Sequence, residues 1–562
     1  MEWLQTTLQT YPEIAVFLSL AIGYWVGGKT FKGFSLGAVT GTLLTGILVG
    51  QLDITITGPL KSLFFLMFLF AVGYGIGPQF VRGLARDGLP QALFAVVVCV
   101  FCLVFPVIGA WTAGYDVGSA AGLFAGSQTI SASMGLATDA INRAGLPPDQ
   151  TQQMLAQMPV AYAVTYVFGT IGSAFLLAQI LPKIMGINLK EACKEYEEEN
   201  RTDAENPTEG TAWHEYELRA YVVQSCADHL TVGAFETRFP SHRVFVEGIR
   251  RDGAVLDVAS TLELRQGDIL AIGGDHQEIV KVSNETACFN EVEDKELISQ
   301  PFSGVDVYVS HAQVNGKTLA ELSSGPGAHG VFIRGIRRGA AGLEIPILAT
   351  TTLHRGDVVT LYGLDKNVKK AATLLGAIDK RSTVTDVATM SMAIVVGALA
   401  GAAILRIGGV PLTLSTAGGA LIAGLVFGWV RSLHPTFGFI PESTVWFMNS
   451  VGLNVFIAVV GISAGPTFVA GLKQLGFSLF LWGVAVTSLP LICAAFVGKY
   501  LFKFHPALLF GCCAGARTTT AALGMINEQA QSTVPSLGYT ITYAVGNTLL
   551  TMWGLVLVLV ML

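Results

Sequence analysis

The stretch that decides the fold reads GCCAGARTTT at residues 511–520, and Arg517 is its only charged residue. A related stretch, AGSQT, stands at residues 125–129 in the first half of the chain. Both interrupt an apolar segment with small and polar residues. We interpret each stretch as the tip of a re-entrant helical hairpin, and the neighbouring segments as helices that hold the two tips inside a membrane.

The composition of the whole chain agrees with a membrane protein. The 562 residues are 52% hydrophobic and 13% charged, with a mean hydropathy of +0.56. Soluble domains carry about 25% charged residues, so this chain has too few to cover a water-facing surface of its size. The net charge of −6 offers no footprint for nucleic acid. These figures exclude a soluble enzyme, a disordered protein and a nucleic-acid binder.

Two apolar regions flank a polar one, which divides the chain into a membrane half at residues 1–182, an insert at 183–381 and a second membrane half at 382–562. Each half offers six apolar segments, and a full span needs about 20 such residues. The segments are 14–26, 36–50, 60–81, 92–113, 118–137 and 160–181, then 387–405, 412–430, 445–469, 475–497, 506–525 and 537–560.

The two halves repeat each other in sequence. Four pairs of segments match in the same order: 36–50 with 414–428, 71–78 with 459–466, 125–129 with 514–518, and 162–169 with 539–546. Internal repeats of this kind are typical of secondary transporters.

The placement of Lys and Arg predicts the orientation. With the N-terminus outside, Lys29, Lys32, Arg82, Arg86 and the insert all fall inside if residues 118–137 form a hairpin that enters from outside. Residues 506–525 then form a second hairpin that enters from inside. The fold class that we predict is an α-helical polytopic membrane protein with two inverted repeats. Each repeat has five spans and one re-entrant hairpin, and both termini are periplasmic.

The insert shows two strand-rich subdomains, at about residues 216–282 and 305–375. In each, an apolar strand leads to an Arg pair (250–251 or 337–338), and a Gly-Asp turn (267–268 or 356–357) opens another strand. This α+β pattern resembles tandem TrkA-C (RCK C-terminal) domains, found on potassium transport systems and other carriers. It is consistent with a packing and dimerisation module or with a regulatory ligand sensor.

Arg517 carries the chemistry that we expect. An arginine near the bilayer midplane costs about 2.5–3.5 kcal/mol on insertion scales, so it normally faces a cavity and has a partner. Its guanidinium matches a carboxylate in a bidentate way. The alternative is a structural ion pair with Asp139 or Glu528. The other candidate substrate-binding residues are polar groups of the two tips, namely Thr518, Thr519, Thr520, Ser127, Gln128, Thr129 and Ser131.

Two glycine series add weaker candidates. Gly73, Gly75, Gly77 and Pro78 match Gly461, Ser463, Gly465 and Pro466. We expect them to break helices near the hairpins, either for tight packing or to expose backbone groups to a ligand, and Gly75 and Ser463 are candidates for the latter. The pairs Cys99–Cys102 and Cys512–Cys513 are interpreted as small buried hydrophobes. No nucleophile, base or metal cluster stands out, and we expect no enzyme activity, cofactor or metal.

The motif HPTFGFIP at residues 434–441 completes a larger pattern, with the two related halves, the tandem insert and residues 511–520 leading to Gly538 and Tyr539. In this combination the chain resembles the aspartate:alanine exchanger family. The resemblance implies a bacterial inner-membrane antiporter that takes in L-aspartate and releases L-alanine, moving charge. We expect a homodimer in lipid, an elevator-like motion and a cytoplasmic insert. The alternatives are a carrier of glutamate or another small dicarboxylate or amino acid, and a cation transporter or channel regulated by its TrkA-C domains.

Overall fold

The computed structural model describes the whole chain apart from short segments. The exceptions are residues 1, 32–33, 36, 57, 84–87, 201–215, 239–243, 257, 276–278, 280–287, 300, 324, 326, 340–341, 379–384, 404, 408–409, 413–414 and 435–437. Lys32, Arg86 and Arg381, which the orientation argument uses, and the centre of the HPTFGFIP motif therefore lie outside the described residues.

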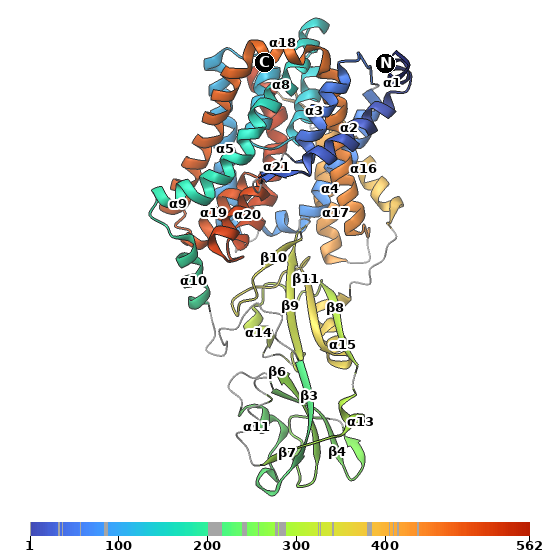
Figure 1. The fold of residues 1–562 in the computed structure, drawn as a ribbon, viewed down its shortest axis with the longest axis vertical. Helices are drawn as coiled ribbons and strands as arrows, with labels where there is room; N and C mark the ends of the chain where they lie inside the picture. Colours follow the sequence, from blue (N-terminus) through green and yellow to red (C-terminus); the bar gives the residue numbers. More distant parts are fainter. Residues whose placement is uncertain are drawn as a thin grey trace. The chain divides into compact units, whose positions relative to one another are not determined.

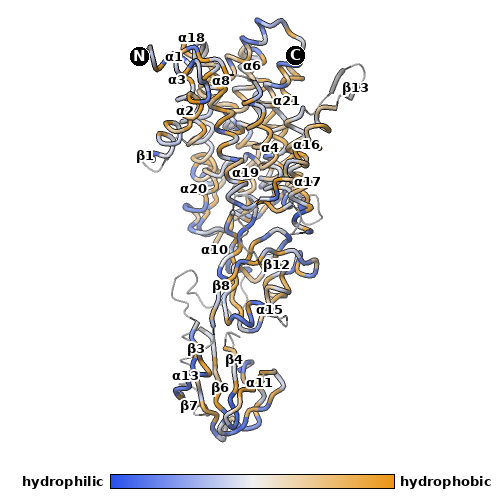
Figure 2. The backbone as a smooth tube through the Cα atoms, turned by 90° about the vertical axis from the view of Figure 1, so that its right-hand side faces the viewer, coloured by the Kyte–Doolittle hydropathy of each residue, from blue (hydrophilic) through white to orange (hydrophobic). Residues whose placement is uncertain are grey.

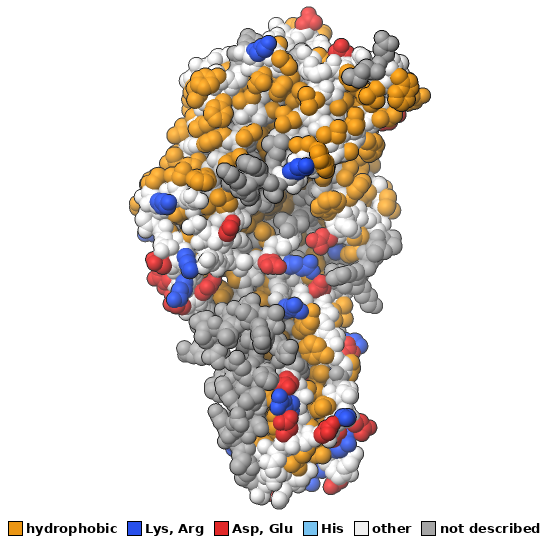
Figure 3. All heavy atoms as spheres, in the orientation of Figure 1, with side chains coloured by type: hydrophobic (Ala, Val, Ile, Leu, Met, Phe, Trp, Pro, Cys, Tyr) orange, Lys and Arg blue, Asp and Glu red, His pale blue; other side chains and the backbone are white. Residues whose placement is uncertain are grey.

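The chain forms two compact units. The membrane unit contains Met1–Tyr196, Arg338–Ile345 and Arg381–Leu562, and the insert unit contains Glu197–Arg337 and Pro346–Lys380. Within the described residues, seven helical segments of the membrane unit are long and apolar enough to cross a membrane, and five shorter apolar helices accompany them. Hydrophobic side chains are spread over the face of these helices that Figure 3 shows. The expected fold class is confirmed: a polytopic α-helical protein whose two membrane regions flank an α+β insert.

The helices of the membrane unit follow the predicted segments closely. In the first half they are α1 (Glu2–Thr10), α2 (Pro12–Gly27), α3 (Ala38–Gly50), α4 (Gly58–Gly83), α5 (Leu89–Ala113), α6 (Val117–Ser127), α7 (Ala132–Arg143), α8 (Pro148–Phe175), the π-helical turn η1 (Leu176–Ile180) and α9 (Leu181–Ile184). In the second half they are α16 (Val387–Ala402), α17 (Ser415–Leu433), α18 (Glu442–Tyr500), α19 (Pro506–Ala516), α20 (Thr520–Ala530) and α21 (Pro535–Met561). A further helix, α10 (Leu189–Glu199), follows the first half.

The two hairpins lie toward opposite ends of the helical bundle (Figures 1 and 2). Both chain termini are at one end of the membrane unit, and α9 is toward the other end (Figure 1). Figure 2 labels α6 near the end that holds the termini and α20 farther from it. The first hairpin, α6–α7, and the second, α19–α20, therefore start from different ends, and their tips meet inside the unit.

The glycine series pack helices together, and the expectation that they break helices is wrong. Helices α4 and α18 run without interruption through Pro78 and Pro466. Gly73 and Gly77 lie against the backbone of α17, and Gly461 and Gly465 lie against the backbone of α3. Small residues allow this close approach of membrane helices, and neighbouring helices compensate the hydrogen bond that a membrane proline removes.

Helix α18 contains both of the spans expected at residues 445–469 and 475–497, but it joins them without a break. It is continuous over 59 residues, and a straight helix of that length would measure about 88 Å at 1.5 Å per residue. The hydrocarbon core is only about 30 Å thick, so α18 must bend between its two apolar windows, Glu442–Pro466 and Gly476–Tyr500. The polar residues between the windows are good helix formers and continue the helix instead of ending it.

Two five-stranded sheets with the same strand order lie between residues 216 and 378, and all of their strands except β10 and the last residue of β9 belong to the insert unit. One sheet is β5-β4-β6-β3-β7 and the other is β10-β9-β11-β8-β12. The strands are β3 (Tyr216–Val223), β4 (Val244–Arg251), β5 (Ala254–Leu256), β6 (Ile269–Asp275), β7 (Phe289–Val292), β8 (Phe302–Val309), β9 (Val331–Arg338), β10 (Leu343–Ile345), β11 (Val358–Leu364) and β12 (Gly376–Ile378). The insert helices are η2 (Ser225–Ala227), α11 (Val232–Glu236), α13 (Lys295–Ile298), α14 (Leu319–Ser323) and α15 (Asp365–Leu375).

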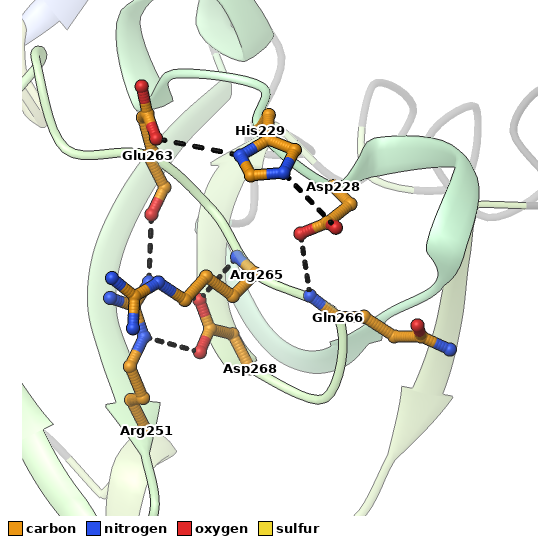
Figure 4. Close-up of polar contacts among 7 residues, drawn as sticks. All are labelled: Asp228, His229, Arg251, Glu263, Arg265, Gln266 and Asp268. Atoms are coloured by element: carbon orange, nitrogen blue, oxygen red, sulfur yellow. Dashed lines mark hydrogen bonds and ion pairs between the residues drawn. The ribbon is translucent and has the colours of Figure 1, made fainter.

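The structure gives a reason for the Arg pair and the Gly-Asp turn of the first subdomain. The Arg251 guanidinium donates to both carboxylate oxygens of Asp268, at 2.8 and 2.7 Å, and the Arg265 backbone N–H donates to Asp268 at 2.8 Å (Figure 4). Burial raises the pKa of Asp268, but these hydrogen bonds outweigh burial and hold the pKa below its ordinary value of 3.8. The pair therefore ties the end of β4 to the start of β6.

Candidate substrate site

The two hairpin tips have the same backbone geometry. In the first, the Thr129 N–H donates to Gly126 O at 3.1 Å and the Ile130 N–H to Ala125 O at 2.9 Å. In the second, the Thr518 N–H donates to Gly515 O at 2.8 Å and the Thr519 N–H to Ala514 O at 3.0 Å. This pair of backbone hydrogen bonds is the Schellman motif, which ends a helix.

A threonine occupies the left-handed position of each motif. Thr129 has φ 55° and Thr518 has φ 54°. Glycine is the usual residue there, because a β-branched side chain is strained at positive φ. Such strain is concentrated at functional sites. The hydroxyls of both threonines are buried, and in the described part of the chain neither has a hydrogen-bond partner.

Glycines let each tip pack closely on a following helix. Gly126 lies against Tyr162 and Thr165 of α8, and Gly515 lies against Tyr539 and Thr542 of α21. The contact is reciprocal, because Gly169 of α8 lies against Gly126 O and Ser127 O, and Gly546 of α21 lies against Ala516. The matching segments of the two halves thus make matching contacts, which fixes the tips on α8 and α21.

Arg517 is the central residue of the site and is fully buried, with 0% exposure. Its Nη2 donates to Ser127 O at 2.6 Å and to Ser173 Oγ at 3.2 Å, and its Nη1 donates to Thr487 O at 3.2 Å. These acceptors belong to α6, α8 and α18. The guanidinium therefore joins the second hairpin to the first hairpin and to two neighbouring helices.

Gln128 occupies the equivalent position in the first tip and makes an equivalent contact. Its Nε2 donates to Val486 O at 3.1 Å and to Ser127 Oγ at 3.0 Å. Pro490 lies four residues after Val486 inside α18. Because proline has no N–H, the Val486 carbonyl lacks its helical partner and accepts from Gln128. The two tips thus converge on adjacent carbonyls, Val486 O and Thr487 O.

The site holds a positive charge among neutral acceptors. Within the described residues, Arg517 makes no ion pair, and the titratable groups that interact with it are the thiols of Cys99 and Cys102. Asp139 interacts instead with Arg143, Lys61 and Ser415, and Glu528 is exposed. The Arg517 Nε and the Gln128 Oε1 are both buried, and neither has a hydrogen-bond partner among the residues that the structure describes. A buried charge of this kind is costly unless a counter-charge compensates it.

The other predicted site residues fall into three groups. Ser127, Gln128, Thr129 and Thr518 belong to the tips; of these, Ser127 accepts from Arg517 through its carbonyl oxygen, and Gln128 donates to the neighbouring Val486 O. Ser131 bonds to the hydroxyl of Tyr162 at 2.7 Å, and Thr519 caps α20 by accepting from the Ala522 N–H at 3.4 Å. Thr520 is exposed on α20.

Gly75 and Ser463 are not brought to the tips by any hydrogen bond of the described residues. Gly75 lies on α4 between the two glycines that face α17, and Ser463 is exposed on α18. Residues two apart on a helix point to different sides, so these two do not share the packed face of their neighbours.

Sequence reasoning missed three residues of the site: Ser173, Thr487 and Pro490. Ser173 and Thr487 contact Arg517 from distant parts of the chain, and neither stands in a polar cluster. The proline inside the apolar segment at residues 475–497 was the one available signal, because an intramembrane proline frees a carbonyl.

Comparisons with known proteins identify the family to which the chain is similar. A family model described as a predicted permease membrane region, Asp-Al_Ex, matches residues 15–183 and 389–559, and a TrkA-C domain model matches residues 307–376. An uncharacterized transporter of Shewanella oneidensis is 62% identical over 563 residues, covering 100% of both chains. Uncharacterized transporters of Bradyrhizobium diazoefficiens and Bordetella parapertussis are 38% and 37% identical, covering 92% and 99% of this chain and 100% and 98% of their own. No solved structure matches the chain.

The family model matches both membrane halves around the Arg517 site, and the insert carries the expected TrkA-C domain. The relatives extend over the full length and are transporters by name. The chain therefore belongs to the aspartate:alanine exchanger family of membrane permeases.

Proposed function

We propose that the protein is a secondary active antiporter that exchanges external L-aspartate for internal L-alanine. One observation carries the proposal: Arg517 is fully buried between two helix breaks, and its bonded partners are two carbonyls and one hydroxyl. A carboxylate supplies the negative charge that these partners lack, and it fits the guanidinium fork.

The charge balance follows from the two substrates. Aspartate carries one net negative charge at neutral pH and alanine carries none, so each cycle moves one charge. Both amino acids have an α-carboxylate that can occupy the same guanidinium, which suits a site that binds them in turn. We propose that the protein works as a homodimer in the bacterial inner membrane, with two inverted repeats, an elevator-like motion, a cytoplasmic insert and periplasmic termini.

A carrier of glutamate or of another small dicarboxylate is the second candidate, because Arg517 selects a carboxylate and does not fix the length of the chain behind it. A cation transporter or channel finds no support at the tips, since a buried guanidinium repels a cation.

Counterflow in proteoliposomes tests the proposal. Proteoliposomes that contain the purified protein are loaded with unlabelled alanine, aspartate, glutamate or succinate. Uptake of labelled aspartate is then followed at zero and at imposed membrane potential. We expect alanine and aspartate to drive uptake, and the alanine-driven uptake to respond to the potential. Arg517→Ala and Arg517→Lys should abolish it, because neither side chain offers the fork. Arg143→Ala, at an exposed arginine that ends the first hairpin, is the matched control. Normal counterflow in Arg517→Ala would refute the site.

A further inference from the structure

The hydrogens of Arg517 are already allocated in a way that constrains how a carboxylate binds. The guanidinium has five N–H donors: two on each Nη and one on Nε. Nη2 serves Ser127 O and Ser173 Oγ, so both of its hydrogens are used. A bidentate carboxylate accepts one hydrogen bond from each of two nitrogens. The two nitrogens are either Nη1 and Nη2 or Nε and Nη2, so both arrangements need a hydrogen of Nη2. One of the two acceptors must therefore yield.

The geometry indicates which acceptor yields. Ser127 O lies 2.6 Å from Nη2, a short charge-assisted bond, and it is a carbonyl at the end of α6, where the helix dipole favours a cation. Ser173 Oγ lies farther away, at 3.2 Å. Its hydroxyl hydrogen is donated to Gly169 O, so Ser173 keeps a good hydrogen bond when Arg517 leaves.

We infer that Ser173 is a place-holder for the substrate carboxylate, and that substrate binding replaces the Ser173 oxygen on Nη2 with a carboxylate oxygen. This inference rests on the proposed function and extends it. The place-holder competes with the substrate, so it lowers the apparent affinity of the carrier. A carrier benefits from this, because a substrate that binds too tightly is released slowly. Ser173 is thus an affinity-setting residue that contacts the charge and not the transported side chain.

Direct binding measurements test the inference. Titration of full-length protein in nanodiscs with aspartate gives the dissociation constant for the wild type, for Ser173→Ala and for Ser133→Ala. Ser133 is the matched control, since it is equally buried and its hydroxyl bonds only to Ile130 O of its own hairpin, at 2.7 Å. We expect Ser173→Ala to bind aspartate three- to tenfold more tightly, where tenfold equals about 1.4 kcal/mol, and Ser133→Ala to match the wild type.

The outcomes separate the two proposals. Equal or weaker binding by Ser173→Ala, with wild-type binding intact, overturns the place-holder and leaves the antiporter standing. A wild type that binds no anion in a panel of amino and dicarboxylic acids overturns both. In proteoliposomes the same variant should show a lower KM for aspartate, and its turnover should not increase in proportion.

A second feature, in the insert, stands independently of Arg517. A β-bulge at Glu247 interrupts the pairing of β4 with β6 between Val246 and Gly248, and bulges re-aim side chains. The Glu247 carboxylate is only 2% exposed, and it accepts from Asn367 Nδ2 of the second subdomain at 2.9 and 3.1 Å. Lys366 Nζ donates to Glu247 O at 2.7 Å.

A histidine of the second subdomain makes a further contact with the first subdomain. His329 Nε2 lies 2.9 Å from Glu236 Oε1, which also accepts from the Val246 N–H at 2.9 Å. The His329 ring packs edge-on against Phe245, with centroids 4.8 Å apart. The first subdomain supplies Glu236, Phe245 and Glu247, and the second supplies His329, so the contact spans the boundary between the two sheets.

We further infer that this contact is a pH-sensitive clamp between the two subdomains, tight when His329 is charged and weaker when it is neutral. The charged groups that face His329 are Glu236 of α11, Glu247 of β4 and Lys366 of α15. The Glu236 hydrogen bond raises the pKa of His329 above its ordinary 6.5; burial and Lys366 oppose the rise, and the two carboxylates support it. The charge-assisted bond is therefore complete below about pH 6.5 and is lost as the pH rises through the higher value.

Distance measurements between spin labels test the clamp on the full-length protein. Labels at Val255 and Leu374, which are 63% and 46% exposed, report the distance between the subdomains, and labels at Val255 and Asn290 report the first subdomain alone. We expect the first distance distribution to broaden between about pH 5.5 and about pH 8.5, on either side of the histidine pKa, and the second to stay constant. His329→Gln and Glu236→Gln should be broad at both pH values. A pH-independent wild-type distribution, or a pH response that survives in both variants, would overturn the clamp.

Discussion

Replacing Arg517 with Met tests whether the guanidinium serves binding or folding. Methionine keeps an unbranched side chain of similar reach and removes the charge. The structure loses three hydrogen bonds, to Ser127 O, Ser173 Oγ and Thr487 O. Hydrogen bonds to a charged group contribute about 1.5–3 kcal/mol each, so the gross loss is roughly 5–9 kcal/mol.

The substitution also removes the cost of burying a charge, and this gain in stability is of similar size to the loss. A buried ion costs several kcal/mol after relaxation, and here Nε has no hydrogen-bond partner. The acceptors left behind keep other partners, since Ser127 O also accepts from the Thr487 hydroxyl at 3.3 Å. We therefore expect the unfolding free energy of Arg517→Met to lie within about 2 kcal/mol of the wild type.

Binding should respond very differently from stability. Truncating one partner of a buried hydrogen-bonded charge pair costs about 2–5 kcal/mol, which is roughly a 30- to 4,000-fold loss of aspartate affinity. Thermal unfolding followed by tryptophan fluorescence, and aspartate titration of the same samples, give both quantities. Arg517→Lys, which keeps the charge and loses the fork, is the control. A fall of the unfolding midpoint by more than about 10 °C, on the order of 3–5 kcal/mol, together with retained aspartate binding, would show that Arg517 is structural.

Three further predictions concern other parts of the molecule. Pro490→Ala restores an N–H that competes with Gln128 for Val486 O, so we expect roughly a tenfold slower exchange in proteoliposomes. Gly428→Val places a side chain within 3.0 Å of the Tyr74 backbone and should destabilise the α4–α17 contact by about 1–3 kcal/mol, measured by thermal unfolding. Because the pKa of folded Asp268 lies below 3.8, its stabilisation of the insert is complete above that pH and lost as the pH falls further; Asp268→Asn should remove this acid dependence, measured by circular dichroism.

The positions of the two tips could be predicted from the sequence, because small and polar residues inside apolar segments leave few other interpretations. The burial of Arg517 followed from the same reasoning. Its acceptors could not be predicted, since Ser173 and Thr487 are 344 and 30 residues away along the chain and only the fold brings them together. The strained backbone of the tip threonines was equally hidden, because glycine is the residue that signals positive φ.

Two errors have simple physical causes. The glycine series was expected to break helices, but glycines at spacing four share one face and serve close packing. The interval between the expected segments 445–469 and 475–497 is helical, because its lysine and glutamine are good helix formers and α18 continues through it. Local composition predicted that the apolar character of the chain is interrupted between the two windows of α18. It did not predict that the backbone stays helical there.

The continuity of α18 has a mechanical consequence. Its first part packs on α3 and α4, and its second part lies beside α8 and reaches both hairpin tips. Any displacement of the tips relative to α3 and α4 is then transmitted along one continuous helix, which can flex at the bend between the two apolar windows and at Pro490, where the Val486 carbonyl lacks its helical N–H. Residues 467–475 would act as a flexure of the carrier, and their stiffness would limit how far and how fast the cargo travels.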